Sequence, residues 1–225
     1  MQNSLAVSPL AASLDLGLPL GDLTKAFTEA VAQAEDTGVR VAVLSVTGGG
    51  DGPGAAGVHE VNAWERALRR WERLDALTVV IADGPSGGPA LEVLSASDLR
   101  LAGDGLLLTL PGTAETGFWP GTVLHRLTHR VGARATRRLS LLTDPATPLT
   151  AQEAHSLGLV DEVCGPGRCE ELLAEVTGRL PARLEPALLR QLVSDAAHTS
   201  YEEALGVHLA ACDRVLRRAT AGSAA

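Results

Sequence analysis

The chain has few aromatic residues and almost no lysine. Phe, Tyr and Trp supply 3% of its 225 residues, whereas apolar residues supply 45%, so the core must consist mainly of Leu, Val and Ala. Only Lys25 among the 19 basic residues is a lysine, and the net charge is −8. Because recognition of a phosphate backbone needs a clustered basic surface, this acidic balance argues against a nucleic-acid-binding protein.

Long apolar runs and paired cysteines are also missing. No stretch approaches the roughly 18 consecutive apolar residues of a membrane span, and no charged segment leads into an apolar one at the N-terminus. The three cysteines, Cys164, Cys169 and Cys212, show no paired metal-ligand spacing. We therefore expect a cytoplasmic protein with reduced thiols, no metal ion and no membrane association.

The first half of the chain alternates helical and strand patterns. A 3.6-residue apolar period predicts helices over residues 22–36 and 59–74, and β-branched runs predict strands within 37–48 and over 77–82. Residues 1–20 carry little pattern. This alternation indicates parallel strand pairing and therefore an α/β architecture, in one large domain with at most a small appendage.

The second half is mostly helical. The patterns predict a helix over residues 91–96, two short strands around the Gly-Asp-Gly turn within 98–111, and a strand over 159–163. Further helices are expected over residues 121–132, 133–143, 150–158, 168–180 and about 185–219.

Two glycine-rich segments are candidates for functional loops. Residues 48–57, "GGGDGPGAAG", form either a flexible connector or a loop whose backbone approaches a ligand closely. Residues 84–88 spell G-x-S-x-G, which would make Ser86 a hydrolase nucleophile with His125, His129 or His155 as its base. Pro85 and Pro89 flank this serine and lack the N–H groups that such a site uses, so a serine hydrolase is a remote alternative.

Three blocks in order resemble the enoyl-CoA hydratase/isomerase (crotonase) superfamily. "DGPSGGPALEVLSASDLRLAG", residues 83–103, is similar to the family's "NG-x-A-x-GGG-x-E-L-A-x-x-C-D". "VLSVTGGGDGPGAAGVHE", residues 43–60, resembles its Ala-Gly loop, and residues 118–163 resemble its later "L-x-P-G…A-x-E-A-x-x-x-G-L-V" segment. The resemblance implies the ClpP/crotonase fold, a repeated β-β-α superhelix with C-terminal helices. It divides the chain into a core, residues 1–165, and a helical region, residues 166–225, that would assemble trimers or hexamers.

The resemblance also implies a site. The family holds a thioester oxygen with two backbone N–H groups, which fall here on Ala56, beside Gly57, and on Pro89. Pro89 has no N–H, so Gly88 or Ala90 takes over the role, or half of the oxyanion hole is missing.

The family's first acid/base glutamate matches Glu92, although a glutamate at such a position is more often a surface carboxylate. The second falls on Gly112, with Glu115 three residues later as a substitute. His59 stands where the family usually has Asp and is a further acid/base candidate, and Trp119 is expected in the pocket wall. Coenzyme A would enter as part of the substrate, without a separate cofactor.

Within the superfamily, the short chain is similar to the DpgB-type homologue of 3,5-dihydroxyphenylglycine biosynthesis. This implies a lyase or isomerase that helps to convert a CoA-bound polyketide into 3,5-dihydroxyphenylacetyl-CoA beside a type III polyketide synthase. The alternative is a catalytically degenerate homologue that binds and assists the synthase or its product.

Overall fold

The computed structural model describes residues 10–49, 57–110, 121–142, 147–165, 167–181, 184–196 and 198–223. The chain divides into two compact units, Met1–Pro181 and Ala182–Ala225. The first unit contains the sheets and six helices among its described residues, and the second contains two. The role of residues 166–225 in assembly stays a prediction.

A five-stranded parallel sheet forms the centre of the first unit. Its strands are β1 (Leu10–Asp15), β2 (Val41–Thr47), β3 (Leu77–Ala82), β5 (Leu99–Gly103) and β8 (Glu162–Cys164). They lie in the order β1-β2-β3-β5-β8, and every neighbouring pair is parallel, which confirms the α/β class. Strand β1 lies in a segment for which the sequence predicts no strand. Its small side chains give little apolar signal, and pairing with β2 determines its conformation.

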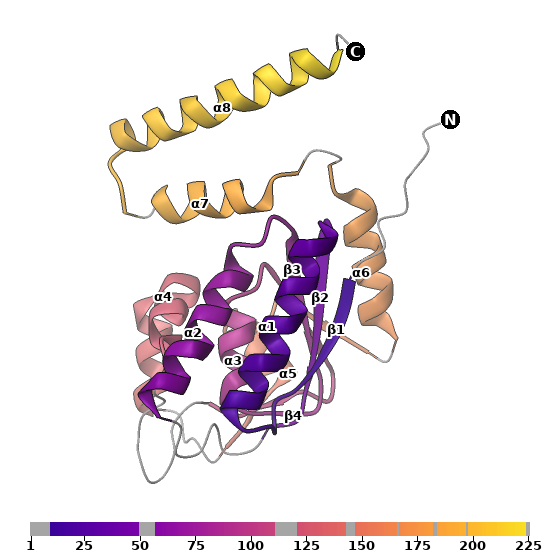
Figure 1. Cartoon of the computed structure of the whole chain (residues 1–225). Helices are drawn as coiled ribbons and strands as arrows, with labels where there is room; N and C mark the ends of the chain where they lie inside the picture. Colours follow the sequence, from indigo (N-terminus) through magenta and orange to yellow (C-terminus); the bar gives the residue numbers. More distant parts are fainter. Residues whose placement is uncertain are drawn as a thin grey trace. The chain divides into compact units, whose positions relative to one another are not determined.

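Helices cover both faces of this sheet. Helices α1 (Leu20–Thr37) and α2 (Val58–Glu72) lie on one side of the strands and α6 (Arg168–Arg179) on the other (Figure 1). The two-residue period of β2 separates the cores. Val41 and Val43 belong to the cluster that contains Leu173 of α6, whereas Leu44 belongs to the cluster of α1 and α2. Both faces are buried, as is usual for a parallel sheet.

A second, three-stranded sheet contains β4 (Pro85–Ser86), β6 (Leu107–Leu108) and β7 (Leu149–Thr150). Strand β6 pairs parallel with β4 and antiparallel with β7. The Gly-Asp-Gly turn therefore carries the chain from one sheet to the other instead of closing a hairpin. Gly103 leaves room at this turn for the Asp83 carboxylate, which would lie 2.3 Å from an added Cβ and would have to move aside.

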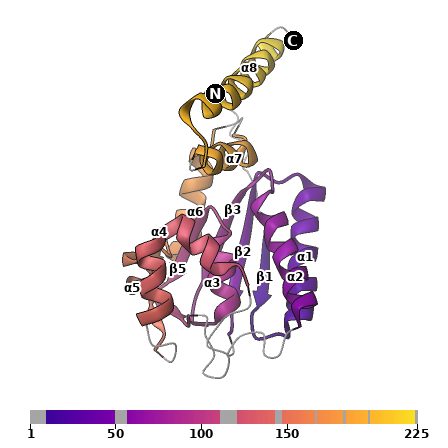
Figure 2. The ribbon, with the colours of Figure 1, turned by 90° about the vertical axis from the view of Figure 1, so that its left-hand side faces the viewer.

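The remaining helices are α3 (Gly88–Ser95), α4 (Val123–Leu142), α5 (Ala151–Ser156), α7 (Pro186–Ala196) and α8 (Tyr201–Ser223). The two helices predicted over residues 121–143 correspond to the two parts of α4, which meet at Gly132 with φ 82°. Figure 2 shows the same ribbon turned by 90° about the vertical axis from the view of Figure 1.

A single helix over residues 185–219 was expected, and this prediction is wrong. The chain breaks before α8, where Ser200 N–H donates to the Glu203 carboxylate (2.9 Å) and Glu203 N–H donates to Ser200 Oγ (3.4 Å). This Ser-x-x-Glu capping box starts a new helix and was readable in the sequence.

Three aromatic side chains join α1 to α2. The Phe27 ring lies 5.2 Å from the Trp64 ring and 5.8 Å from the Trp71 ring, measured between centroids, and all three are buried. Since large aromatic side chains contribute strongly to core packing, this cluster compensates for the scarcity of aromatics elsewhere.

We expect Phe27→Ala to lower the free energy of unfolding by about 3–5 kcal/mol, because it removes the ring between both tryptophans and leaves a cavity. Urea unfolding followed by tryptophan fluorescence measures the change. Lys25→Ala, at an exposed position of the same helix, is the control and should shift stability by less than about 0.5 kcal/mol. Equal effects of the two substitutions would contradict this account of the core.

Candidate active site

Glu92 is a completely buried carboxylate in the middle of α3. The Trp64 indole Nε1–H of α2 donates to its Oε2 at 2.6 Å. A hydrogen bond of this length fixes the orientation of the Glu92 carboxyl group. The reading of Glu92 as a surface carboxylate is therefore wrong, and its burial agrees with the position that the superfamily resemblance gives it.

Helix α3 is also held at its C-terminal end. The Arg130 guanidinium donates to the carbonyl oxygens of Ser95 and Ser97, the latter at 2.5 Å. The side chain of Arg130 is exposed as a whole, but partial burial of its guanidinium against α3, followed by the nearby Arg100 charge, lowers its pKa to about 10. Asp98 accepts from Thr78 N–H and Oγ1–H, both at 2.9 Å, and so joins the end of α3 to β3. These contacts fix the helix that carries Glu92.

The N-terminal turn of α3 decides which backbone group can donate to a substrate. Gly88, Pro89 and Ala90 are all buried there. Pro89 has no N–H, and Ala90 N–H donates to Gly87 O at 2.9 Å. Of the two replacements for Pro89 that the sequence leaves open, the geometry favours Gly88. Gly88 and Glu92 are four residues apart, so they lie about 6 Å apart along one face of the helix.

The two glycine-rich segments meet at this turn. An added Cβ at Gly49 would lie 2.1 Å from Gly87 N and 2.9 Å from Ser86 C. Only a glycine permits this approach of one backbone to another. The first described residue after the loop, Gly57, is exposed, and its N–H donates to Glu60 Oε2 at 3.0 Å. The loop 48–57 therefore begins against the turn that carries Gly88.

Four residues of the expected site, Ala56, Gly112, Glu115 and Trp119, lie outside the described residues. The chain after them is anchored to α2, because Thr122 N–H donates to Glu65 Oε1 at 2.7 Å and Thr122 Oγ1 donates to Oε2 at 2.8 Å. Arg126 pairs with the same carboxylate at 2.9 Å. Burial alone would raise the pKa of Glu65, but the bonds from Arg126 and Thr122 lower it below its ordinary value.

The structure does not bring His59 to Glu92. His59 is exposed on the first turn of α2, five residues before Trp64 and hence about 140° around the helix from it. Its acid/base role stays a prediction.

The geometry of Ser86 does not favour a nucleophile. Ser86 is 1% exposed within β4, and its hydroxyl donates to Gly84 O at 3.4 Å. The candidate bases His125 and His129 are exposed and lie 3.2 Å apart on α4. The His155 ring lies 3.2 Å from Val160 O.

Trp64, Gly49 and Arg130 are site residues that the sequence analysis did not identify. The apolar stripe of α2 marks Trp64 as a core residue but does not reveal its polar partner. Within the described ranges, no group of three His, Cys, Asp or Glu side chains could hold a metal ion. No helix in that same part of the chain is long and apolar enough to cross a membrane.

The parallel sheet, the second small sheet and a buried glutamate behind a glycine turn define a protein of the crotonase-fold class. The sequence profile described as Enoyl-CoA hydratase/isomerase matches residues 21–222. The chain belongs to the enoyl-CoA hydratase/isomerase family.

Individual relatives agree with this assignment. A protein named Enoyl-CoA-hydratase from Amycolatopsis orientalis is 43% identical over 159 residues, which cover 70% of this chain and 71% of that protein. The crystal structure of an enoyl-CoA hydratase/isomerase from Marinobacter aquaeolei is similar in fold, with a TM-score of 0.73 at 22% identity over 92% of this chain and 83% of that one. An enoyl-CoA hydratase/isomerase from Cupriavidus metallidurans CH34 gives a TM-score of 0.72 at 20% identity over 86% and 78%.

We expect Gly49→Ala to displace the turn at Gly87–Gly88, because the new methyl group meets backbone that has no flexible side chain to move. If Gly88 N–H is an oxyanion donor, its displacement should lower turnover of a CoA thioester about 10²-fold. Gly178→Ala in α6 is the matched control, since nothing lies within 4 Å of its added Cβ, and it should keep full activity. Equal turnover in both variants would contradict the role of this contact.

Proposed function

We propose that the protein is a hydratase-type lyase or isomerase that uses Glu92 as its acid/base on a CoA thioester. The observation that carries the proposal is the buried, oriented carboxylate of Glu92 bonded to Trp64 (2.6 Å). Burying a glutamate is unfavourable unless it is bonded, so a carboxylate held in this way suits a catalytic task. The family membership of the chain supports the same reaction class.

In the proposed reaction, Gly88 N–H and Ala56 N–H hold the thioester oxygen while Glu92 takes a proton from the α-carbon. The C–H electrons form an enolate whose negative oxygen is stabilised by the two donors, each worth about 10²- to 10³-fold in rate. For dehydration, the protonated Glu92 gives the proton to the β-hydroxyl, the C–O bond breaks and water leaves. For isomerisation of a β,γ-unsaturated thioester, the protonated Glu92 gives the same proton to the γ-carbon, and the double bond moves to the α,β position.

The narrower proposal is dehydration and isomerisation of a polyketide thioester towards 3,5-dihydroxyphenylacetyl-CoA, beside a type III polyketide synthase. The support is the resemblance of the short chain to the DpgB-type homologue, together with the single matching glutamate. One carboxylate suits a proton shuttle better than the addition of water across a double bond. The competing proposal is a binding protein that assists the synthase or its product.

We also propose a homo-oligomer, a trimer or hexamer, in the cytoplasm, with no cofactor besides the coenzyme A of the substrate. Helices α7 and α8 expose large apolar side chains in a single chain, among them Val193 (74%), Tyr201 (75%) and Leu216 (66%). Exposed apolar side chains of this kind are typical of surfaces that another protein covers.

Glu92→Gln should lower the rate of product formation by about 10²- to 10⁴-fold, because glutamine keeps the size and can still accept from Trp64 but cannot take a proton. The measurement is turnover of 3-hydroxyacyl-CoA by the isolated protein and formation of aromatic product with the synthase present. Glu29→Gln, at an exposed position of α1, is the control. An unchanged product yield in Glu92→Gln would remove the catalytic role and leave the binding protein.

Trp64→Phe should lower kcat more than it raises KM, because it removes the N–H that orients Glu92 while keeping an aromatic ring in the core. The pH profile of kcat should also change, because the substitution removes a hydrogen bond from the group that takes the proton in the proposed reaction. Steady-state kinetics across pH measure both effects. Trp71→Phe, which removes the indole N–H that donates to Ser97 Oγ at 2.9 Å, is the matched control. A pH profile that moves equally in both variants would show a purely structural role of Trp64.

A further inference from the structure

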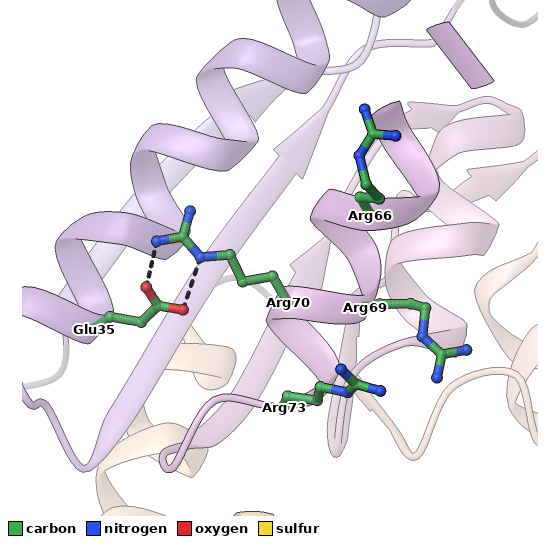
Figure 3. Close-up of a pocket in the computed structure, with 5 residues that line it drawn as sticks. All are labelled: Glu35, Arg66, Arg69, Arg70 and Arg73. Atoms are coloured by element: carbon green, nitrogen blue, oxygen red, sulfur yellow. Dashed lines mark hydrogen bonds and ion pairs between the residues drawn. The ribbon is translucent and has the colours of Figure 1, made fainter. Parts of the chain in front are cut away.

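The solvent face of α2, together with its C-cap residue Arg73, carries four arginines within eight positions. Arg66, Arg69, Arg70 and Arg73, which we call the α2 arginine face, are spaced by three and four residues, so they lie on one side of the helix. This side is opposite to the buried stripe of Trp64, Leu68 and Trp71. The four side chains and Glu35 of α1 line a shallow hollow of about 490 Å³ (Figure 3).

Among the described residues, a carboxylate partner is found for Arg70 alone of these four arginines. Arg70 donates to both oxygens of Glu35, through Nε at 2.8 Å and through Nη2. No ion pair joins Arg66, Arg69 or Arg73 to a carboxylate of the described residues. Elsewhere in the first unit, Arg100 pairs with Asp161 and Arg126 with Glu65 and Glu72.

The helix itself does not explain the cluster. The helix dipole favours cations in the last turn, which accounts for the sign of Arg69 and Arg70 but not for Arg66. Like charges three and four residues apart destabilise a helix. The chain has a net charge of −8, so it has enough acidic residues to neutralise these arginines, yet in the described part of the chain only Arg70 is paired in this way. An anionic ligand from outside the chain would remove this repulsion.

The face is separate from the proposed acyl-CoA site. Arg66, the arginine of this face nearest to Gly57, is nine positions after it, which corresponds to about 14 Å along the helix. Trp64, which contacts Glu92, projects from the opposite side of the same helix. A ligand on the arginine face therefore does not compete with a thioester at Glu92.

The shape and charge of the face favour a protein over a small polyanion. A small molecule needs a concave pocket that buries most of its surface, and this hollow is shallow and lined by the ends of long side chains. Glu35 adds a carboxylate that would repel a compact polyphosphate, whereas a protein surface meets each charge separately. Arg66 and Arg73 are about 10 Å apart along the helix, which equals two turns of a partner helix.

We propose that the α2 arginine face is a docking surface for an acidic partner protein, whose carboxylates lie at three- and four-residue spacing on a helix. Each planar guanidinium can bind a carboxylate through two parallel hydrogen bonds, which gives orientation as well as attraction. The complex would be sensitive to salt, because its charges remain close to solvent.

The test uses the full chain and a fluorescein-labelled, alanine-based helical peptide with glutamates at this spacing. Fluorescence anisotropy should show binding at low salt that weakens about tenfold as ionic strength rises towards 0.3 M. The same peptide with glutamines in place of glutamates should not bind. The variant Arg66→Glu/Arg69→Glu/Arg73→Glu should bind at least about tenfold more weakly than the unaltered chain.

The matched control is Arg134→Glu/Arg137→Glu/Arg138→Glu on α4, which changes the net charge equally at exposed positions and should keep binding within about twofold. Circular dichroism checks folding, and arginine-to-glutamine variants replace any charge reversal that fails to fold. Turnover at Glu92 should stay unchanged in the face variant. No binding by the unaltered chain, equal loss in both variants, or preferential binding of inorganic tripolyphosphate at this face would overturn the proposal.

Discussion

The hydrogen bond from Trp64 to Glu92 connects the two helices on which the site depends. It joins residues 28 positions apart, and both partners are buried. A buried carboxylate is unfavourable without a bonded donor. The bond forms only when α2 packs against α3 and Glu92 points towards Trp64, so the helix packing and the orientation of Glu92 depend on each other. Phe27 of α1 holds the Trp64 ring from its other side. Three helices thus determine the direction of one carboxylate.

Close approaches at two glycines form the second constraint. Gly49 lies against the backbone of Gly87 at a distance that no Cβ would permit, and Gly103 lies against the side chain of Asp83. These contacts bring the ends of β2, β3 and β5 to a common edge, where a parallel sheet gathers its functional loops. Pro89 fits this arrangement at the start of α3, since the first turn of a helix does not need its N–H.

Helix α2 combines three surfaces with different tasks. Its inner side carries Trp64 and Trp71 into the core, its flank holds Thr122 and Arg126 through Glu65, and its outer side presents the arginine face. The arginines near Glu65 and Asp161 are paired, whereas three of the outer ones meet no carboxylate of the described residues. One short helix therefore contacts Glu92, Thr122 and Arg126 while presenting the arginine face to solvent.

The sequence by itself determined the α/β class, most helices and strands, and the match of Glu92 to the family's glutamate. Apolar periodicity and the glycine-rich blocks, which carry these predictions, are local signals. It could not reveal β1, whose conformation depends on pairing with β2, nor the distribution of the short strands over two sheets. The Ser-x-x-Glu motif indicates the break before α8, but the helical apolar period across this segment favours one continuous helix. Only the tertiary structure decided that Trp64 is the partner of Glu92 and that Ala90 N–H is already bonded to Gly87 O. Such contacts join residues far apart in the chain or depend on the exact path of a turn. Local sequence patterns reveal neither of these.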